Sequence, residues 1–377
     1  MNALSHQPKV AIYDRNDGKD GWQTLWEDAL ACCDHGYFQS WAWINRWLVE
    51  LPPEIPVFLI RAECHSGFAM GIFTFRRRKR WSIVDSRAVH LHRSGHCSFD
   101  SLTPEYNALL SNSDNPNLLL SLLDALPINW NEAYFTLLDL RRYPGSILNN
   151  KQLGNYRVTW VDQRPSYYVE LDKVRDCDGD YPATIGSQIR QQLRASTRKA
   201  EKCGALRIEQ AESLVDAQAI FSSLVELHQL AWQRRGEKGA FHDAWFRTFH
   251  QNLIAERMRY GEIQLLRILC GDHVLGCVYN FVYQNEVLYY QSGFDYEHFS
   301  QLRPGLLSHK LAIEFNAARG RGSYNFLAGE VRYKRSLATN KHILGSSVIQ
   351  KRDAGLAVER WARKVRSACS PGRQQQR

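Results

Sequence analysis

The 377-residue sequence lacks the short motifs that mark several large enzyme classes. It has no GxxxxGK phosphate loop, no GxGxxG dinucleotide motif, no GxSxG nucleophile elbow and no HExxH metal pair. These absences argue against nucleotide hydrolysis, dinucleotide redox chemistry, the elbow hydrolases and the helix-borne zinc enzymes.

Long apolar runs and a cysteine framework are also missing. The richest apolar run, Leu118 to Leu123, is followed by Asp124 and is far shorter than the ~20 residues that a membrane-spanning helix needs. Residues 1–17 contain no apolar signal region, so we expect a cytoplasmic protein. The nine cysteines are scattered and form no CxxC pair, which predicts reduced, buried thiols.

Positive charge is in excess, and most of the excess lies at one end of the chain. Lys and Arg number 48 against 39 Asp and Glu, a net charge of +9. Residues 351–377 hold eight basic and two acidic side chains, which leaves +3 for the other 350 residues. This nearly balanced body argues against a general nucleic-acid binder, and we expect no nucleic-acid partner.

The basic tail has its own helical pattern. Within residues 354–369, apolar side chains recur every three or four positions and basic side chains fill much of the remaining surface. The pattern predicts a short basic helix that contacts an anionic membrane surface peripherally. The alternative is that its apolar face packs on the body of the protein.

The order of the expected elements indicates an α+β fold and not an alternating, doubly wound one. In the first half we expect helices within 20–50 and at 114–125, strands at 56–62, 68–75 and 133–139, a long loop after the second strand, and a Pro-, Gly- and Asn-rich connector at 141–165. In the second half we expect helices at 187–203, 214–232, 243–259 and 306–319, and strands at 166–171, 206–210, 263–270, 274–283, 287–295, 323–329 and 342–350, with a polar segment between the last two strands. Gly204 is expected to end the first of these helices in the left-handed conformation.

The first chemical signal is the junction Gln301–Leu302–Arg303–Pro304–Gly305–Leu306, which follows the last strand of the 263–295 meander. A helix that starts there directs its free N–H groups at the end of that strand, an arrangement that accepts a pyrophosphate. Gly305 would let a ligand approach the backbone, and Arg303 would add a charge-assisted contact. The alternative is a plain turn with a Pro-Gly helix start.

The second signal is the segment 329–335, which offers Glu330, Tyr333 and Lys334 at a strand end. Glu can act as a base, Tyr as an acid, and Lys as a clamp for carboxylate or phosphate. A solvated polar loop is the alternative.

Two further groups are less specific. Arg190, Arg194 and Arg198 share one helix face, which suits either an anionic ligand or a solvated surface. Histidines 90, 92 and 96 lie near Cys97, but no acid–histidine helix pair supports a metal site, so we expect no metal.

Together these segments resemble a known family. The stretches LHQLAWQRRGEKGAF (227–241), LYYQSGFD (288–295), RPG (303–305) and FLAGEVRYKRS (326–336) occur in this order and resemble the GNAT-like acyltransferases of the cellulose-biosynthesis CelD group. The helix RASTRKAEKCGALRI (194–208) is similar to the start of the second half of the FemABX peptidoglycan aminoacyltransferases.

The resemblance implies tandem GNAT-like domains, each with a mostly antiparallel twisted sheet flanked by helices. The expected boundaries are 1–150 for the N-terminal domain, 151–350 for the acyltransferase domain and 351–377 for the basic tail. It also implies a thioester donor, acyl-coenzyme A, whose pantetheine lies along Leu288–Gly293 and whose pyrophosphate lies on Gln301–Leu306.

The expected reaction is acyl transfer from coenzyme A to an amine or hydroxyl of a sugar-like or cell-envelope acceptor, with polysaccharide biosynthesis as a setting. Strand N–H groups near Ser292 and Gly293 would polarise the donor carbonyl. Glu330 would be the base, with Asp100 as its alternative, and Tyr333 the acid. Lys334 would orient a phosphate or carboxylate of the acceptor.

Two other functions stay open at this point. One is a FemABX-like transferase that uses aminoacyl-tRNA, although the body's charge of +3 favours coenzyme A. The other is a non-catalytic accessory protein of an envelope polysaccharide machine, which the single glycine of the 301–306 loop supports.

Overall fold

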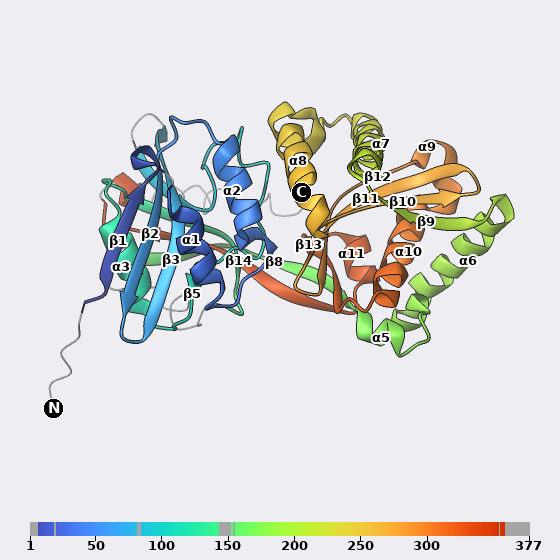
Figure 1. Ribbon diagram of the computed structural model, residues 1–377, viewed down its shortest axis with the longest axis horizontal. Coiled ribbons are helices and arrows are strands. Elements are labelled where there is room, and N and C mark those ends of the chain that lie inside the picture. Colours follow the sequence, from blue (N-terminus) through green and yellow to red (C-terminus); the bar gives the residue numbers. More distant parts are fainter. Residues whose placement is uncertain are drawn as a thin grey trace. The chain divides into compact units, whose positions relative to one another are not determined.

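The computed structural model describes residues 7–18, 20–80, 84–142, 152–153, 155–353 and 355–358. The chain divides into two compact units, coloured along the sequence in Figure 1. Unit 1 is drawn from residues 1–35, 51–163 and 345–377, and unit 2 from residues 36–50 and 164–344. The boundaries expected after residues 150 and 350 stay predictions for independently folding domains.

Unit 1 is built on a mostly antiparallel sheet. Its strands are β1 (Lys9–Asp14), β2 (Val57–Cys64), β3 (Gly67–Arg80), β4 (Val84–Leu91), β5 (Leu110–Ser111), β6 (Glu132–Asp139) and β7 (Gln152–Leu153). Strands β1 to β4 pair antiparallel in sequence order, and β6 pairs parallel with β4. Two longer strands, β8 (Tyr156–Glu170) and β14 (Asn340–Gln350), have residues in both units.

The helices of unit 1 are α1 (Trp22–Leu30), the 3-10 turn η1 (Arg15–Asp17) and α3 (Pro116–Ala125). Helix α3 begins two residues after its predicted start, because Asn115 accepts a hydrogen bond from the Asn117 N–H at 3.0 Å and Pro116 fills the first position, which needs no N–H partner. Its leucines are buried against β2 and β3 and form much of the core of this unit.

Unit 2 repeats this plan with more helices. Its helices and turns are η2 (Tyr37–Gln39), α2 (Trp41–Glu50), α5 (Leu171–Arg175), η3 (Tyr181–Thr184), α6 (Ser187–Cys203), α7 (Leu214–Gln233), η4 (Ala240–His242), α8 (Ala244–Arg257), η5 (Met258–Tyr260), α9 (Tyr296–Phe299), η6 (Ser300–Leu302), α10 (Pro304–Ala318) and α11 (Arg332–Leu337). Its strands are β9 (Leu206–Gln210), β10 (Ile263–Cys270), β11 (His273–Tyr283), β12 (Glu286–Phe294) and β13 (Ser323–Ala328).

The sheet of unit 2 has the order β8-β13-β12-β11-β10-β9. The β12–β13 pair is parallel, and the β8–β13, β11–β12, β10–β11 and β9–β10 pairs are antiparallel. In each unit a parallel pair, β4–β6 or β12–β13, is joined through a helix, α3 or α10. The expected α+β fold, with mostly antiparallel sheet flanked by helices, is confirmed.

Helices cover both faces of the sheet of unit 2, with α7 and α8 on one side and α10 and α11 on the other (Figure 1). A Cβ on Gly293 of β12 would lie 2.4 Å from the Leu224 carbonyl oxygen of α7. The next residue, Phe294, faces the opposite way and its ring contacts that of His309 on α10. Gly293 therefore lets α7 pack closely on β12.

The structure contradicts three of the predictions about secondary structure. Strand β4 lies where a long loop is expected, β8 begins at Tyr156 inside the expected connector, and α11 lies in the expected polar segment. In addition, β1 occupies residues for which the sequence analysis predicts no element. Strands β1, β4 and β8 owe their form to partners that are distant in sequence, which a local pattern does not reveal.

Gly204 ends α6 as predicted, but for a different reason. Its φ of 161° is extended and not left-handed. A Cβ at this position would lie 2.6 Å from the backbone nitrogen of Gly271, so the close approach of these two turns requires glycine.

The predicted tail helix 354–369 lies outside the described residues except for residues 355–358. Among the helices that the structure describes, none combines the length and the apolar composition needed to cross a membrane.

A buried histidine in unit 2 gives a prediction for stability. His250 is fully buried, and among the described residues its Nε2 has no hydrogen-bond partner. Burial lowers the pKa of His250 from 6.5 to about 3. Between these values the unfolded chain binds a proton that the folded chain does not, so the free energy of unfolding falls as the pH drops below 6.5, by about 1.4 kcal/mol per pH unit for this residue.

Urea unfolding at pH 7.5, 6.5 and 5.5 measures this effect. The variant His250→Phe is expected to lose that share of the pH dependence, whereas His242→Gln, at an exposed position, should keep it. An unchanged slope in His250→Phe would show that folding does not lower the pKa of His250.

Candidate functional site

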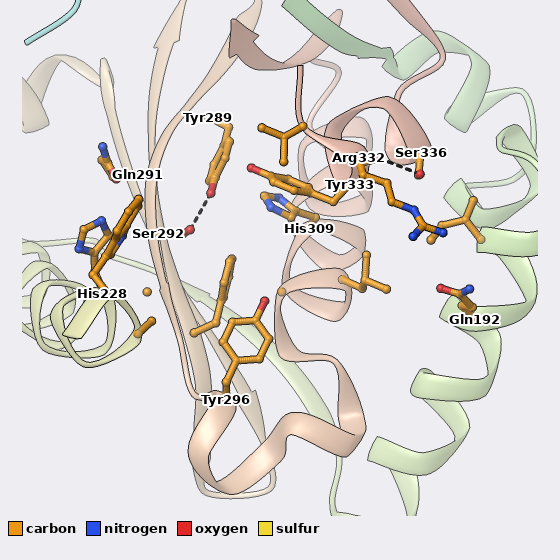
Figure 2. A pocket seen from close by; sticks show the side chains of 18 of the residues that line it. Gln192, His228, Tyr289, Gln291, Ser292, Tyr296, His309, Arg332, Tyr333 and Ser336 are labelled. Atoms are coloured by element: carbon orange, nitrogen blue, oxygen red, sulfur yellow. Dashed lines mark hydrogen bonds between the residues drawn. The ribbon is translucent and has the colours of Figure 1, made fainter. Parts of the chain in front are cut away.

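A bulge in β12 sets the directions of the site's side chains. In the pairing with β11, Tyr279 is opposite Gln291 and Asn280 is opposite Tyr289, so Tyr290 is an extra residue. Figure 2 shows Gln291 beside His228 of α7, and Tyr289 on the other side of β12, toward His309 of α10.

Strands β12 and β13 then separate. Their register pairs Glu286–Leu288 with residues 323–325, and no later residues of these two described strands are paired with each other, although β12 continues to Phe294 and β13 to Ala328. Asn325 holds the diverging strand, because its side chain accepts from the Leu327 N–H at 2.8 Å and donates to Glu286 at 3.0 Å. Leu327 has a φ of 61°, which turns β13 away from β12.

A cavity of about 830 Å³ opens beside the separated part of β12. It is lined by Gln188, Ile189, Gln192, His228, Ala231, Trp232, Arg235, Tyr289, Gln291, Ser292, Gly293, Phe294, Tyr296, Gly305, Leu306, His309, Val331, Arg332, Tyr333 and Ser336. An extended ligand with amide groups fits such a place, because the edge of a strand offers backbone hydrogen bonds along its length.

A row of hydroxyl groups lies along one wall of the cavity. The Tyr289 and Ser292 oxygens are 2.6 Å apart, as drawn in Figure 2, and the Tyr333 hydroxyl donates to Tyr289. The Tyr333 ring stacks on His309 with a centroid distance of 5.6 Å. Burial, followed by the neighbouring tyrosines, raises the pKa of Tyr333, so this hydroxyl stays protonated at neutral pH.

Two imidazoles line the cavity. His309 is 2% exposed, and burial lowers its pKa to about 3. His228 is 6% exposed, and burial also lowers its pKa below 6.5. Its Nδ1 lies 3.2 Å from Gln229 Oε1, and the Gln229 amide in turn donates to the Lys238 carbonyl at 3.0 Å. Both rings are therefore neutral at pH 7.

The start of α10 forms the other end of the cavity. The Tyr296 hydroxyl accepts a hydrogen bond from the Gly305 N–H, and a Cβ on Gly305 would lie 2.6 Å from that oxygen. Desolvation raises the pKa of Tyr296, whereas the nearby Arg235 charge and the Gly305 N–H oppose the rise. The Tyr296 hydroxyl oxygen therefore lies beside Gly305, where the sequence predicts the phosphate of the donor. Arg235 is the cation next to it.

The cavity brings together half of the residues that the sequence predicts. Ser292, Gly293, Gly305, Leu306 and Tyr333 line it. Gln301, Arg303, Glu330 and Lys334 lie in the same unit but are not among the described residues that form its lining.

These other residues have contacts of their own. Arg303 is exposed at the start of α10. Glu330 accepts from the Tyr167 hydroxyl at 3.2 Å, and Lys334 donates to the Ala328 carbonyl at 2.9 Å. Asp100 belongs to unit 1, where it accepts from the Ser94 N–H and hydroxyl, each at 2.8 Å. Their proposed roles stay predictions.

The sequence analysis did not single out several lining residues. Gln188 and Gln192 lie on the helix whose arginines are noted above, but Arg190 donates to the Ile185 carbonyl at 2.9 Å and Arg194 pairs with Asp180 at 3.0 Å. His228 and Arg235 lie inside the segment 227–241 that carries the resemblance. The resemblance of this segment is what the sequence offers for these two residues, and it does not predict which side chains point into a cavity.

Within the described residues, no cluster of three or more His, Cys, Asp or Glu side chains is arranged to hold a metal ion.

Comparison with known proteins agrees with this geometry. Residues 187–335 match the family described as "Acetyltransferase (GNAT) domain". The fold is similar to that of a crystal structure of FemX, over 89% of this chain and 97% of that chain, with 10% identity and a TM-score of 0.56. It is also similar to a conserved protein of unknown function from Bacteroides thetaiotaomicron VPI-5482, over 88% and 97% of the two chains, with 10% identity and a TM-score of 0.50. No curated protein matches the sequence.

The match over residues 187–335 and the FemX-like fold agree with the GNAT-like fold that the sequence resemblance predicts.

Proposed function

We propose that this protein transfers an acyl group from acyl-coenzyme A to an amine or hydroxyl of a sugar-like or cell-envelope acceptor. The observation that carries the proposal is the cavity beside the separated part of β12, which ends at Gly305 and Arg235. The amide groups of a pantetheine would bind along β12, and its diphosphate would replace the Tyr296 hydroxyl at Gly305.

The reaction on an amine acceptor needs one proton acceptor and one proton donor. The amine nitrogen forms a bond to the thioester carbonyl carbon and loses a proton to a base, and the carbon–sulfur bond breaks. His228 is the lining group that can take the proton, and Tyr333 can give one to the leaving thiolate. They reach the cavity from opposite sides of β12 (Figure 2), so the base and the acid are separate groups.

Calorimetric binding of acetyl-coenzyme A tests the donor. Arg235→Gln is expected to weaken binding by roughly tenfold to a hundredfold, the value of a charge-assisted hydrogen bond to phosphate. Arg303→Gln is the matched control, which separates the cavity arginine from the one that the sequence predicts. Pantetheine, which has no phosphate, should bind Arg235→Gln and wild type equally.

Gly305→Val should abolish acetyl-coenzyme A binding, because its side chain would fill the space at Tyr296. Equal binding by Gly305→Val and wild type would place the donor elsewhere. If Arg303→Gln weakens acetyl-coenzyme A binding and Arg235→Gln does not, Arg303 is the residue that contacts the phosphate.

A second donor, aminoacyl-tRNA, has one observation in its favour. Gly305 already donates to Tyr296, and Pro304 has no N–H, so the start of α10 offers few donors to a diphosphate. A wild-type chain that fails to bind acetyl-coenzyme A but binds a charged tRNA would support this alternative.

A further inference from the structure

The cavity carries positive charge without negative charge. Among the described residues that line it, Arg235 and Arg332 are the ones with a formal charge. Neither guanidinium forms an ion pair within the described part of the chain. Their neighbours differ, because Arg234 pairs with Glu297 and Arg335 lies 3.8 Å from Glu330. The two lining charges are therefore available to a ligand.

These two arginines lie in different parts of the cavity. Arg235 follows α7, lies over the Trp232 ring at 5.5 Å and acts on Tyr296 at the start of α10. Arg332 begins α11, and Figure 2 shows its guanidinium extending toward Gln192 of α6. The donor diphosphate of the proposed function accounts for Arg235 but not for Arg332.

Two glutamines of α6 line the same cavity as Arg332. Gln188 and Gln192 are four residues apart on α6 and so share the face that lines the cavity. Neither amide forms a side-chain hydrogen bond with any described residue. Ser336, on the next turn of α11, donates to the Arg332 carbonyl at 2.8 Å. This wall thus offers a guanidinium and two amides to a ligand.

We propose that Arg332, Gln188 and Gln192 form a subsite for an anionic group, a phosphate or a carboxylate, on the acceptor. The proposal rests on the proposed function, which assigns β12 and Arg235 to the donor. A planar guanidinium pairs with either anion through two parallel hydrogen bonds. The amides, which both donate and accept, suit the hydroxyl groups of a sugar. The acceptor class is therefore an amino sugar that carries a phosphate or a carboxylate.

Calorimetry on the full chain tests the subsite with three probes: glucosamine, glucosamine 6-phosphate and muramic acid, which is glucosamine with a carboxylate-bearing ether. Wild type is expected to bind at least one of the anionic sugars about tenfold more tightly than glucosamine. Preference for the 6-phosphate identifies phosphate as the ligand group, and preference for muramic acid identifies carboxylate. Arg332→Gln should lose the preference, whereas the control Arg335→Gln, which alters a residue outside the cavity, should keep it.

Binding of acetyl-coenzyme A tests whether the donor site is intact and whether each variant is correctly folded. Its affinity should be the same in Arg332→Gln and wild type. Equal affinity of wild type for all three sugars, or a preference that survives in Arg332→Gln, would overturn the subsite. A preference that depends on Arg332 in a chain that does not bind acetyl-coenzyme A supports the subsite and counts against the proposed donor.

Discussion

Replacing Tyr333 by phenylalanine is expected to lower turnover by about two to four orders of magnitude and to leave donor affinity nearly unchanged. Tyr333 lines the cavity, and its hydroxyl is joined through Tyr289 to Ser292 on the separated part of β12. Burial raises the pKa of this hydroxyl, so it is protonated at neutral pH and can donate to a leaving thiolate.

The measurement is thiol release from acetyl-coenzyme A in the presence of an amine acceptor identified by screening amino sugars. Tyr289→Phe is the matched variant, because it keeps the Tyr333 hydroxyl but removes the group to which it donates. Its expected loss is smaller. Wild-type turnover in Tyr333→Phe would show that the thiolate leaves without this proton.

Long local patterns explain which parts of the fold were predictable. Helix α6 and strand β9 have the predicted bounds, and β10, β11 and β12 agree within one residue at each end. In each case the apolar period and the flanking turn residues lie within one continuous segment. Residues 156–160 alternate apolar and polar side chains, with Tyr156 and Val158 buried, but they lie within a Pro-, Gly- and Asn-rich stretch whose composition favours a connector.

The part of the site that lies in one continuous segment was also predictable, and the part assembled from distant segments was not. The junction of β12 and α10 is continuous in sequence, and Ser292, Gly293, Gly305 and Leu306 do line the cavity. Gln192, His228, His309 and Arg332 come from four separate helices, so their convergence depends on packing between elements. From residue chemistry alone, Glu330 and Lys334 were predicted to act together with Tyr333. In the structure, Tyr333 of α11 lines the cavity, whereas Lys334 donates to the Ala328 carbonyl at the end of β13.

The bulge in β12 is a further feature that local reasoning does not supply. Regular alternation along β12 would put Tyr289 and Gln291 on one face of the sheet. The extra residue Tyr290 instead turns Gln291 toward His228 while Tyr289 faces His309. The cavity therefore receives chemically different groups from the two faces of one strand.

His228 is the side chain that we expect to act as the base. A base that accepts a proton from an amine must be unprotonated at the working pH. His228 meets this condition, because burial, with help from the Arg235 charge, lowers its pKa below 6.5. Its ring is held by Gln229, whose Oε1 lies 3.2 Å from the His228 Nδ1. With Nδ1 held as a donor, Nε2 keeps the lone pair that a base needs.

We therefore expect His228→Gln to lower turnover by about two to four orders of magnitude with little change in acetyl-coenzyme A affinity. Glu330→Gln, which alters the residue that the sequence predicts, is the comparison. In wild type, turnover should fall only below pH 6.5, where His228 becomes protonated, and this acid limb should be missing in His228→Gln. Full turnover in His228→Gln together with loss in Glu330→Gln would assign the base to Glu330, whose carboxylate would then have to reach the cavity from its place beside Tyr167.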